Sequence, residues 1–283
     1  MFAWLSTHAW GLAVGFSTAL TFVAAFLVLE RFAPVESDQS PRRVLFNVQS
    51  GLLTEVMTIA VAPLAALLPG YILSKTGTGW IDLGLGNPQT LTQRVLAVIC
   101  YLFVYDVSQY WWHRLQHAHW FFWASHRLHH SDEAFNASTA LRRHWIESFT
   151  SPFIASIPPA VLFAPFGRDG LAIYIFLTAI GYWNHANLRV SLGPWFVSPM
   201  YHRLHHSALP EHDGKNLAGV FPILDVMFGT YCKPSRDAHP TGLYNGERDI
   251  GVVRSHLAVF RLWRDGWRRL QRHPLGVAGR HLS

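Results

Sequence analysis

The sequence predicts an all-α fold, a polytopic membrane helix bundle with about four to five membrane-embedded helices and a histidine-rich cap that binds two metal ions. Half of the 283 residues are hydrophobic and only 14% are charged, whereas about a quarter are charged in a typical soluble domain. Apolar runs of membrane-spanning length recur along the chain. Between them lie histidines spaced three and four residues apart, which places them on one face of a helix.

The N-terminal region, residues 1–94, is expected to contribute membrane spans. No Lys, Arg, Asp or Glu occurs in residues 1–28. This stretch is too long for a signal-peptide core and lacks a basic leader, so it predicts a membrane helix over about 9–29. A second span is expected over about 53–73, and a glycine-rich loop at 75–90 follows it.

A third helix is expected to start near Leu91, at the border of a central region over residues 95–235. It is apolar up to Tyr105 and then continues into the first histidine pair, so we predict one long helix that leaves the membrane. Further on, residues 149–187 form two uncharged runs around a short polar turn, and the first run contains four prolines. Because eighteen helical residues reach only about 27 Å, this segment predicts a tight or re-entrant hairpin.

The distribution of charge predicts the orientation. Thirteen of the 23 Lys and Arg residues follow residue 188, whereas residues 75–90 contain one. By the positive-inside rule, the histidine-rich segments face the cytoplasm. The chain ends in a basic amphipathic tail, 236–283, in which residues 254–273 interleave aromatic residues with arginines. This pattern predicts either an interfacial helix on anionic lipid or a helix packed on the cytosolic region.

The histidine spacing predicts a metal centre. The string HRLHH occurs twice, at 126–130 and 202–206, and a further pair lies at His113 and His117. Imidazole is a natural ligand of borderline transition metals. Eight histidines exceed the four ligands of one structural zinc and suffice for two ions with open positions. A weakly binding histidine-rich surface tract is the alternative, but such a tract would not keep its register in two separate copies. Only Cys100 and Cys232 are present, which excludes thiolate and iron–sulfur ligation.

Several segments between residues 95 and 235 together resemble the sterol desaturase and fatty acid hydroxylase superfamily, whose members are membrane di-iron oxygenases. They are D-x6-HRLQH (106–117), HRLHHSD (126–132), LRRHWIE (141–147), NHAN (184–187), HRLHHS (202–207) and KNLAGVFPILDVMFGTY (215–231). Leu224 stands where that family usually has Trp.

The resemblance implies a set of iron ligands. The eight histidines of the three boxes are expected to bind two iron ions: His113, His117, His126, His129, His130, His202, His205 and His206. His185 is expected to be a ninth ligand, because the family commonly has a histidine there and because it ends an apolar run. His144 and His212 are compatible with ligation or with hydrogen bonding alone.

Ligating imidazoles need their second nitrogen held, usually by a carboxylate or a carbonyl. The candidates are Asp106, Glu147 and Asp225, each close in sequence to a histidine box. Asp106 and Glu147 border apolar runs, where an unpaired charge is costly. We therefore expect both to support the ligands.

The expected reaction is an O2-dependent hydroxylation of an unactivated C–H bond in a lipid, such as a fatty acyl chain. Zinc has no redox chemistry of its own, although it ranks high in affinity and could replace iron on overexpression. Desaturation of a lipid or sterol would use the same residues. A haem-bearing electron carrier or a membrane metal transporter is the alternative from another class. Haem ligands, however, are single histidines within spans, and transporter ligands lie near the midplane.

The partners follow from what the chain lacks and from its charge. It has no flavin or nicotinamide fingerprint, so a separate ferredoxin, or a cytochrome with its reductase, is expected to supply electrons. The formal net charge is +6. With long apolar runs, this charge favours anionic lipid headgroups over nucleic acid as the partner.

Overall fold

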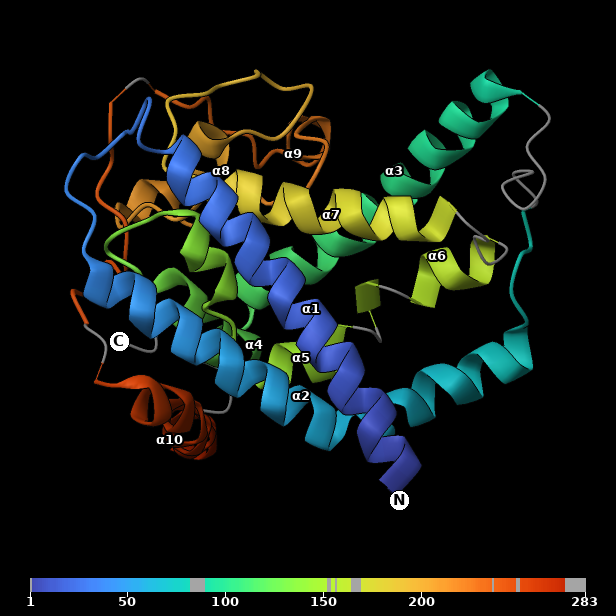
Figure 1. The fold of residues 1–283 in the computed structure, drawn as a ribbon. Coiled ribbons are helices and arrows are strands. Elements are labelled where there is room, and N and C mark those ends of the chain that lie inside the picture. Colours follow the sequence, from blue (N-terminus) through green and yellow to red (C-terminus); the bar gives the residue numbers. More distant parts are fainter. Residues whose placement is uncertain are drawn as a thin grey trace.

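The computed structural model describes residues 2–81, 90–151, 154–155, 157–163, 169–235, 237–247 and 250–272 (Figure 1). In this part of the chain all regular structure is helical and only isolated β-bridges occur, which confirms the predicted all-α class.

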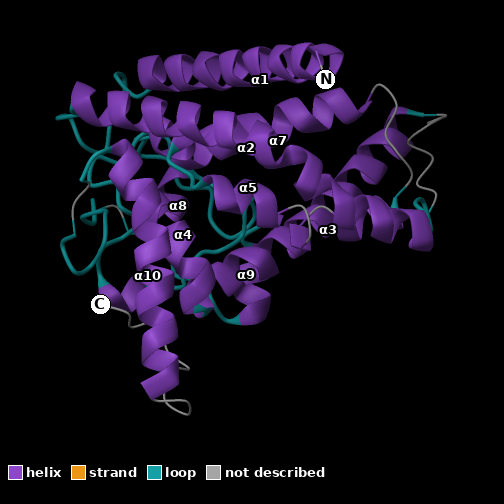
Figure 2. Cartoon of the chain, turned by 90° about the horizontal axis from the view of Figure 1, so that it is seen from below, coloured by secondary structure: helices purple, strands orange, loops and turns teal. Residues whose placement is uncertain are grey.

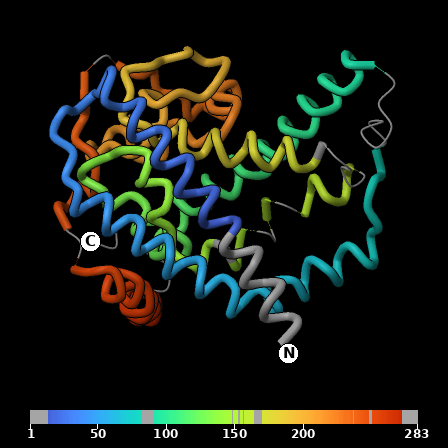
Figure 3. The backbone as a smooth tube through the Cα atoms, viewed as in Figure 1, coloured from blue at the N-terminus to red at the C-terminus, as the bar shows by residue number. Residues whose placement is uncertain are grey.

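Three long helices open the fold. They are α1 (Phe2–Leu29), α2 (Pro41–Thr76) and α3 (Leu91–Ala118). Among the described helices, α2 and α3 are long and apolar enough to cross a bilayer, and residues 14–29 of α1 form a shorter apolar helix. Their length and composition are those of membrane-spanning helices, and Figure 3 shows the end of α2 and the start of α3 reaching away from the rest of the chain.

Local sequence signals set the ends of these helices. Pro41 occupies the first turn of α2, where its missing N–H costs no hydrogen bond. The helix therefore begins well before the predicted span, and its first half buries polar residues such as Asn47 and Thr54 against the cap. Thr90 and Gln93 form a capping box at the start of α3. As predicted, α3 then runs unbroken from apolar sequence into the first histidine pair.

The proline-containing segment forms short helices. They are α5 (Trp145–Ser151) and α6 (Ile157–Leu162), followed after a gap in the described residues by α7 (Asp169–His185). The backbone N–H of Ile81 donates to Leu162 O at 2.7 Å, which joins the described part of the glycine-rich loop to the end of α6. The segment thus reaches the far end of the bundle, and α7 brings the chain back.

The cap consists of short helices at the opposite end. They are α4 (Trp120–His130), the 3-10 turn η1 (Ala137–Leu141), α8 (Pro199–His205), the 3-10 turn η3 (Pro210–His212) and α9 (Ile223–Phe228). Figure 2 shows α1 as an outer layer, with α2 and α7 beneath it and the cap helices further in. The ends of α3 and α7 enter the cap, so the histidine-bearing elements converge far from the C-terminal end of α2 and the start of α3 (Figure 1).

The last helix, α10 (Val252–Arg272), runs across the direction of α1 and α2 and is seen nearly end-on in Figure 1 and lengthwise in Figure 2. It packs on α4, where the Trp263 ring stacks on Phe121 with centroids 4.4 Å apart. A Cβ atom added to Gly266 would lie 2.5 Å from the Trp120 ring, so glycine permits this close approach.

Candidate metal centre

The structure gathers nine histidines, the same nine predicted as ligands, into two groups. Within each group the candidate ligand atoms lie within 4.8 Å of one another. The five-histidine cluster consists of His113, His117, His126, His130 and His205. The four-histidine cluster consists of His129, His185, His202 and His206. All nine are buried except His113, which is half-buried.

The two HRLHH strings serve these clusters reciprocally. In each string the first and fifth residues, one helical turn apart, enter the same cluster, while the fourth residue enters the other. On α4 the first and fifth residues are His126 and His130, and the fourth is His129. At α8 they are His202 and His206, and the fourth is His205. Both clusters therefore draw on both strings, and the rings of His130 and His206 stack between them with centroids 4.2 Å apart.

Hydrogen bonds define the ring tautomers in the five-histidine cluster. His113 Nδ1 lies 2.8 Å from Leu217 O, and His126 Nδ1 lies 3.1 Å from Glu147 Oε2. A carbonyl and a carboxylate only accept, so both rings donate from Nδ1 and present a lone pair at Nε2. These two Nε2 atoms are 3.1 Å apart. Facing lone pairs repel each other, and a cation bound to both nitrogens removes the repulsion.

The same arrangement occurs in the four-histidine cluster. His129 Nδ1 lies 3.2 Å from Arg142 O, and His185 Nδ1 lies 2.7 Å from Gly181 O. Their Nε2 atoms face each other at 3.0 Å. His202 Nε2 joins them, 3.1 Å from His185 Nε2.

A second proton on these rings is disfavoured. Burial, reinforced by the neighbouring His185, holds the pKa of both His129 and His202 well below its ordinary value. Burial and the neighbouring His130 do the same to the pKa of His206. Buried neutral imidazoles with converging lone pairs therefore fit a metal ion better than a proton.

Ring nitrogens without a hydrogen bond also indicate a metal site. Both ring nitrogens of His206 and Nε2 of His205 are buried and have no hydrogen-bond partner within the described part of the chain. A buried polar atom without a partner costs free energy, and coordination of a transition metal would satisfy His205 Nε2 and one of the two nitrogens of His206. The donor set of neutral imidazoles fits such an ion.

Glu147 is the predicted acid that directly contacts a cluster histidine. Besides His126, its Oε2 accepts a hydrogen bond from Gln116 Nε2 at 2.9 Å. Burial opposes ionisation, yet the contacts with His126 and Gln116 bring the pKa of Glu147 below its ordinary value. The carboxylate is thus charged and fixes the orientation of His126.

The other two predicted acids lie one step further from the histidines. Asp106 accepts hydrogen bonds from the backbone N–H groups of Gly219 and Phe221, at 2.8 and 2.7 Å. Asp225 accepts from the N–H of Leu217 at 2.7 Å. Neither carboxylate holds an imidazole directly, contrary to expectation, because backbone amides occupy its oxygens. Both instead order the segment whose Leu217 carbonyl accepts the hydrogen bond from His113.

The sequence analysis missed a buried network supplied by α2. Arg142 Nε donates to Asn47 Oδ1 at 2.8 Å, and Asn47 Nδ2 donates to Asp132 Oδ2 at 2.8 Å. All three side chains are fully buried. This network positions the Arg142 carbonyl that accepts from His129. The available signal in the sequence was Asn47, a polar residue shortly before the predicted span over about 53–73.

Glu30, just beyond α1, was also missed. Its Oε1 accepts hydrogen bonds from the N–H groups of Ala137 and Asn187, at 2.8 and 2.9 Å. Ala137 begins η1, and Asn187 follows His185 by two residues. One buried carboxylate therefore ties the end of α7 to the loop after α4. The signal in the sequence was an acidic residue directly after an uncharged run.

The undecided histidines lie outside both clusters. His144 Nε2 donates to His256 O at 3.0 Å, and Nδ1 accepts from the Ile146 N–H at 3.2 Å, so both nitrogens are occupied by hydrogen bonds. His212 packs against His239 with ring centroids 4.8 Å apart, in the half-exposed loop region.

Comparison with known proteins gives consistent matches. The fatty acid hydroxylase family matches residues 98–230. Alkylglycerol monooxygenase from Homo sapiens is 32% identical over 237 residues, covering 79% of this chain and 48% of that protein. The Danio rerio protein of the same name is 36% identical over 153 residues, covering 49% of this chain and 32% of that protein. Ornithine lipid hydroxylase OlsE from Rhizobium tropici is 30% identical over 163 residues, covering 55% and 45%. No solved structure matches the chain.

The chain spans less than half the length of these curated relatives. The segment that matches the family contains every histidine of both clusters. By contrast, α1 and α2, with Glu30 and Asn47, lie outside it.

Proposed function

Because the chain belongs to the sterol desaturase and fatty acid hydroxylase superfamily, we propose that it is a membrane oxygenase that uses two iron ions and O2 to hydroxylate a lipid. The nine clustered histidines are the proposed ligands. A lipid or sterol desaturase is the alternative on the same site. The names of the relatives, which are monooxygenases and lipid hydroxylases, favour hydroxylation.

The observation that carries this proposal is the pair of opposed Nε2 contacts, one in each cluster. Two adjacent cation sites made only of neutral imidazoles suit a redox-active pair of transition metals. Structural zinc sites close four ligands around one ion and often use thiolate, and the cysteines of this chain, Cys100 and Cys232, belong to neither cluster.

Iron bound in both clusters would supply the activation of O2 for attack on a C–H bond. The residues of this chain hold and shield that pair. Glu147 and the carbonyls of Leu217, Arg142 and Gly181 fix the Nδ1–H groups, so each Nε2 lone pair points inward. On one side, Phe135 is fully buried and packs on His206 with centroids 4.9 Å apart. This packing keeps water from the four-histidine cluster.

Trp123 covers the five-histidine cluster in a similar way. Its ring lies 5.2 Å from that of His117 and 5.4 Å from that of His130, centroid to centroid. A dry, aromatic environment suits an oxidation in which water would intercept the reactive species.

The substrate is proposed to come from the bilayer. Helix α3 runs from apolar sequence directly into His113 and His117, so the clusters lie at the end of a membrane helix. Alkyl glycerol lipids and ornithine lipids are the first classes to test, because they appear in the names of the relatives. We place the clusters on the cytoplasmic side, where a ferredoxin, or a cytochrome with its reductase, would deliver electrons.

The test compares the lipids of cells that express the wild type, His202→Ala or His239→Ala under 18O2. His239 lies outside both clusters and is the matched control. One lipid class should gain one 18O atom with the wild type and with His239→Ala, and not with His202→Ala. Loss of two hydrogens without added oxygen would change the assignment to desaturase. A change confined to water-soluble metabolites would contradict the lipid substrate.

A further inference from the structure

Helix α10 exposes an apolar strip to its surroundings. Val253, Leu257, Phe260 and Trp267 recur at helical spacing on one side, and between 45% and 61% of each residue is exposed. The opposite side is buried, with Val259 at 1% exposure against α4 and α5. The strip is therefore not the face by which the helix packs on the protein.

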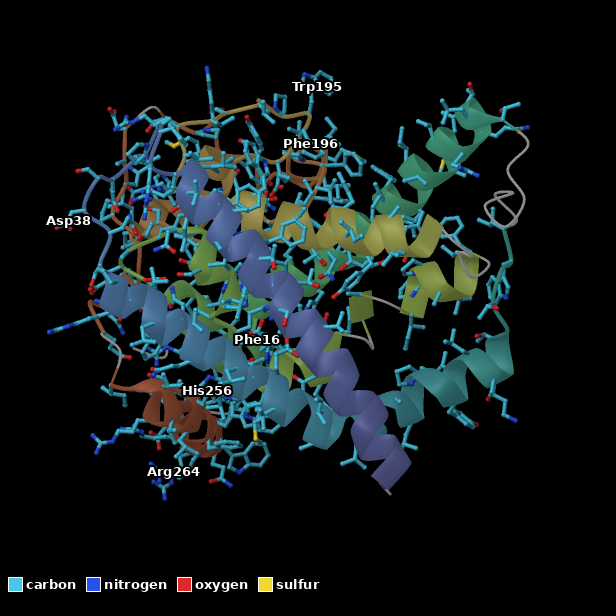
Figure 4. All side chains as sticks on the ribbon, viewed as in Figure 1. Phe16, Asp38, Trp195, Phe196, His256 and Arg264 are labelled. Atoms are coloured by element: carbon cyan, nitrogen blue, oxygen red, sulfur yellow. The ribbon has the colours of Figure 1, made fainter. Side chains whose placement is uncertain are left out.

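Arginines border this strip. The helix contains six arginines and a single acidic residue, Asp265. Arg261 and Arg268 are exposed, and Figure 4 shows Arg264 pointing away from the bundle. A strongly basic edge beside a row of large apolar side chains matches the composition of helices that lie on anionic membranes.

The packing of α10 shows which way the strip faces. His256 lies between α10 and α2, where its Nε2 is 3.0 Å from Ser50 Oγ (Figure 4). Phe260, in the strip, approaches Trp145 at the start of α5 with centroids 6.5 Å apart. The other side of the helix, with Ala258 and Leu262, lines a cavity of about 560 Å³ in the cap. The strip thus lies next to the contact of His256 with α2, on the other side from Ala258 and Leu262.

The contact of α10 with α2 lies near the beginning of the exposed apolar surface of α2, between Leu45 and Leu52. Two residues after its contact at Ser50, α2 exposes Leu52, and one turn later Val56, each about half exposed. Helix α10 also runs across α1 and α2 (Figure 2). If α2 crosses the bilayer, α10 lies along the bilayer surface at the depth where the hydrocarbon begins.

A groove at the C-terminal half of α10 adds a place for one lipid. It has a volume of about 540 Å³ between the start of α4 and α10, with Trp263 and Trp267 as apolar walls. Arg264 and Arg268 also line it. Guanidinium groups bind phosphate in two-pronged hydrogen bonds, and the indole rings suit the adjoining glycerol and acyl chain.

We propose that α10 is a bilayer-surface helix that binds anionic phospholipid. The apolar strip enters the boundary between headgroups and acyl chains, and the arginines contact the phosphates. Trp263 Nε1 donates to Phe121 O at 2.7 Å and so joins α10 to α4. The position of α10 at the bilayer surface would therefore also set the depth of α4, which carries three cluster histidines. The inference rests on the membrane location in the proposed function and not on the reaction.

The test measures immersion depth, so it does not depend on turnover. In a Cys100→Ala, Cys232→Ala background, a nitroxide is attached to Leu257→Cys, to Phe260→Cys or, as the matched control, to Arg261→Cys. The full chain is placed in nanodiscs of phosphatidylcholine with or without phosphatidylglycerol. Collision rates with O2 and with a water-soluble nickel complex report depth, and metal content verifies folding.

We expect labels at positions 257 and 260 to collide mainly with O2, and the label at 261 mainly with nickel. Phosphatidylglycerol should increase the difference, and Arg264→Glu with Arg268→Glu should remove that increase. Equal nickel collision at all three positions in both lipids would overturn the proposal. That result would place the strip in water and would leave the proposed reaction untouched.

Discussion

His129 and His185 direct their Nε2 atoms at each other across 3.0 Å, although the two residues are 56 positions apart in the chain. Each ring donates its Nδ1–H to a backbone carbonyl, so neither Nε2 carries the proton that would make this a hydrogen bond. Removing one of the two rings should therefore remove a ligand and leave the fold in place.

His185→Ala should reduce the metal content from close to two ions per chain to close to one, because the four-histidine cluster loses one of its four ligands while the five-histidine cluster stays intact. Activity should be lost. Metal analysis of protein purified from iron-replete cells checks this, with His239→Ala as the control. Two ions retained in the His185→Ala protein would remove His185 from the ligand set.

Glu147→Ala should weaken metal binding about 10–100-fold, the usual cost of losing a partner that orients a ligating histidine. Glu147→Gln should lose less, because the amide oxygen still accepts from His126 Nδ1. Competition with a chelator of known affinity gives both values. Equal affinities for the wild type and both variants would show that His126 needs no partner.

Glu30→Ala should lower the thermal stability of the detergent-solubilised protein, whereas Glu30→Gln should not. Both backbone donors bind the same oxygen, Oε1, which a glutamine also provides. Alanine would leave two buried N–H groups without an acceptor, at about 1–3 kcal/mol each. The exposed Glu211 is the control position for alanine. A Gln variant as unstable as the Ala variant would mean that the charge itself is required.

Asn47→Leu should destabilise the fold by at least about 3 kcal/mol, because it removes two hydrogen bonds to charged groups of about 1.5–3 kcal/mol each. The lost partners are the fully buried side chains of Arg142 and Asp132. Leu45→Ala, at an exposed position of the same helix, should change stability little. Denaturant titration of both variants makes the comparison, and similar midpoints would contradict the role of the network.

Acidification should destabilise the docking of α10 through His256. Burial, together with the neighbouring His144, lowers the pKa of His256 from 6.5 to about 4. Between these values the unfolded chain binds more protons than the folded one, so the stability from neutral His256 is complete above pH 6.5 and is lost towards pH 4.

His256→Gln should therefore show a smaller loss of thermal stability than the wild type between pH 6.5 and 4. The difference between the two proteins isolates His256 from the cluster histidines, which titrate in both. Parallel pH profiles would contradict this role.

The sequence predicted the helical class, the continuous α3 and the eight box histidines from local spacing. It predicted His185 from the family resemblance and from its place at the end of an apolar run. It did not predict which histidine joins which cluster. The side chain of His129 points in a different direction around α4 from those of His126 and His130. The histidines that it joins come from α7 and α8. Spacing alone cannot reveal these distant partners.

The supporting residues were harder to predict for the same reason. In four cluster histidines Nδ1 donates to a backbone carbonyl, namely that of Leu217, Arg142, Gly181 or Lys215. Any residue type can supply a carbonyl. Asp106 and Asp225 lie near histidine boxes in sequence, yet both accept from amides of the segment 217–221. Asp225 also accepts from the hydroxyl groups of Tyr201 and Thr230. Proximity in sequence drew attention to these acids, but the predicted contact with an imidazole nitrogen was wrong for both.

The reciprocal use of the two HRLHH strings makes the metal sites interdependent. An ion held by His126 and His130 sets the rotation of α4, and the same rotation aims His129 into the other cluster. His205 and the pair His202 and His206 are coupled in the same way at α8. Under the proposed two-ion function, the first ion would bear the entropic cost of ordering both helices, and the second would meet ligands already aligned. We therefore expect cooperative loading, with half-filled protein a minor species during assembly.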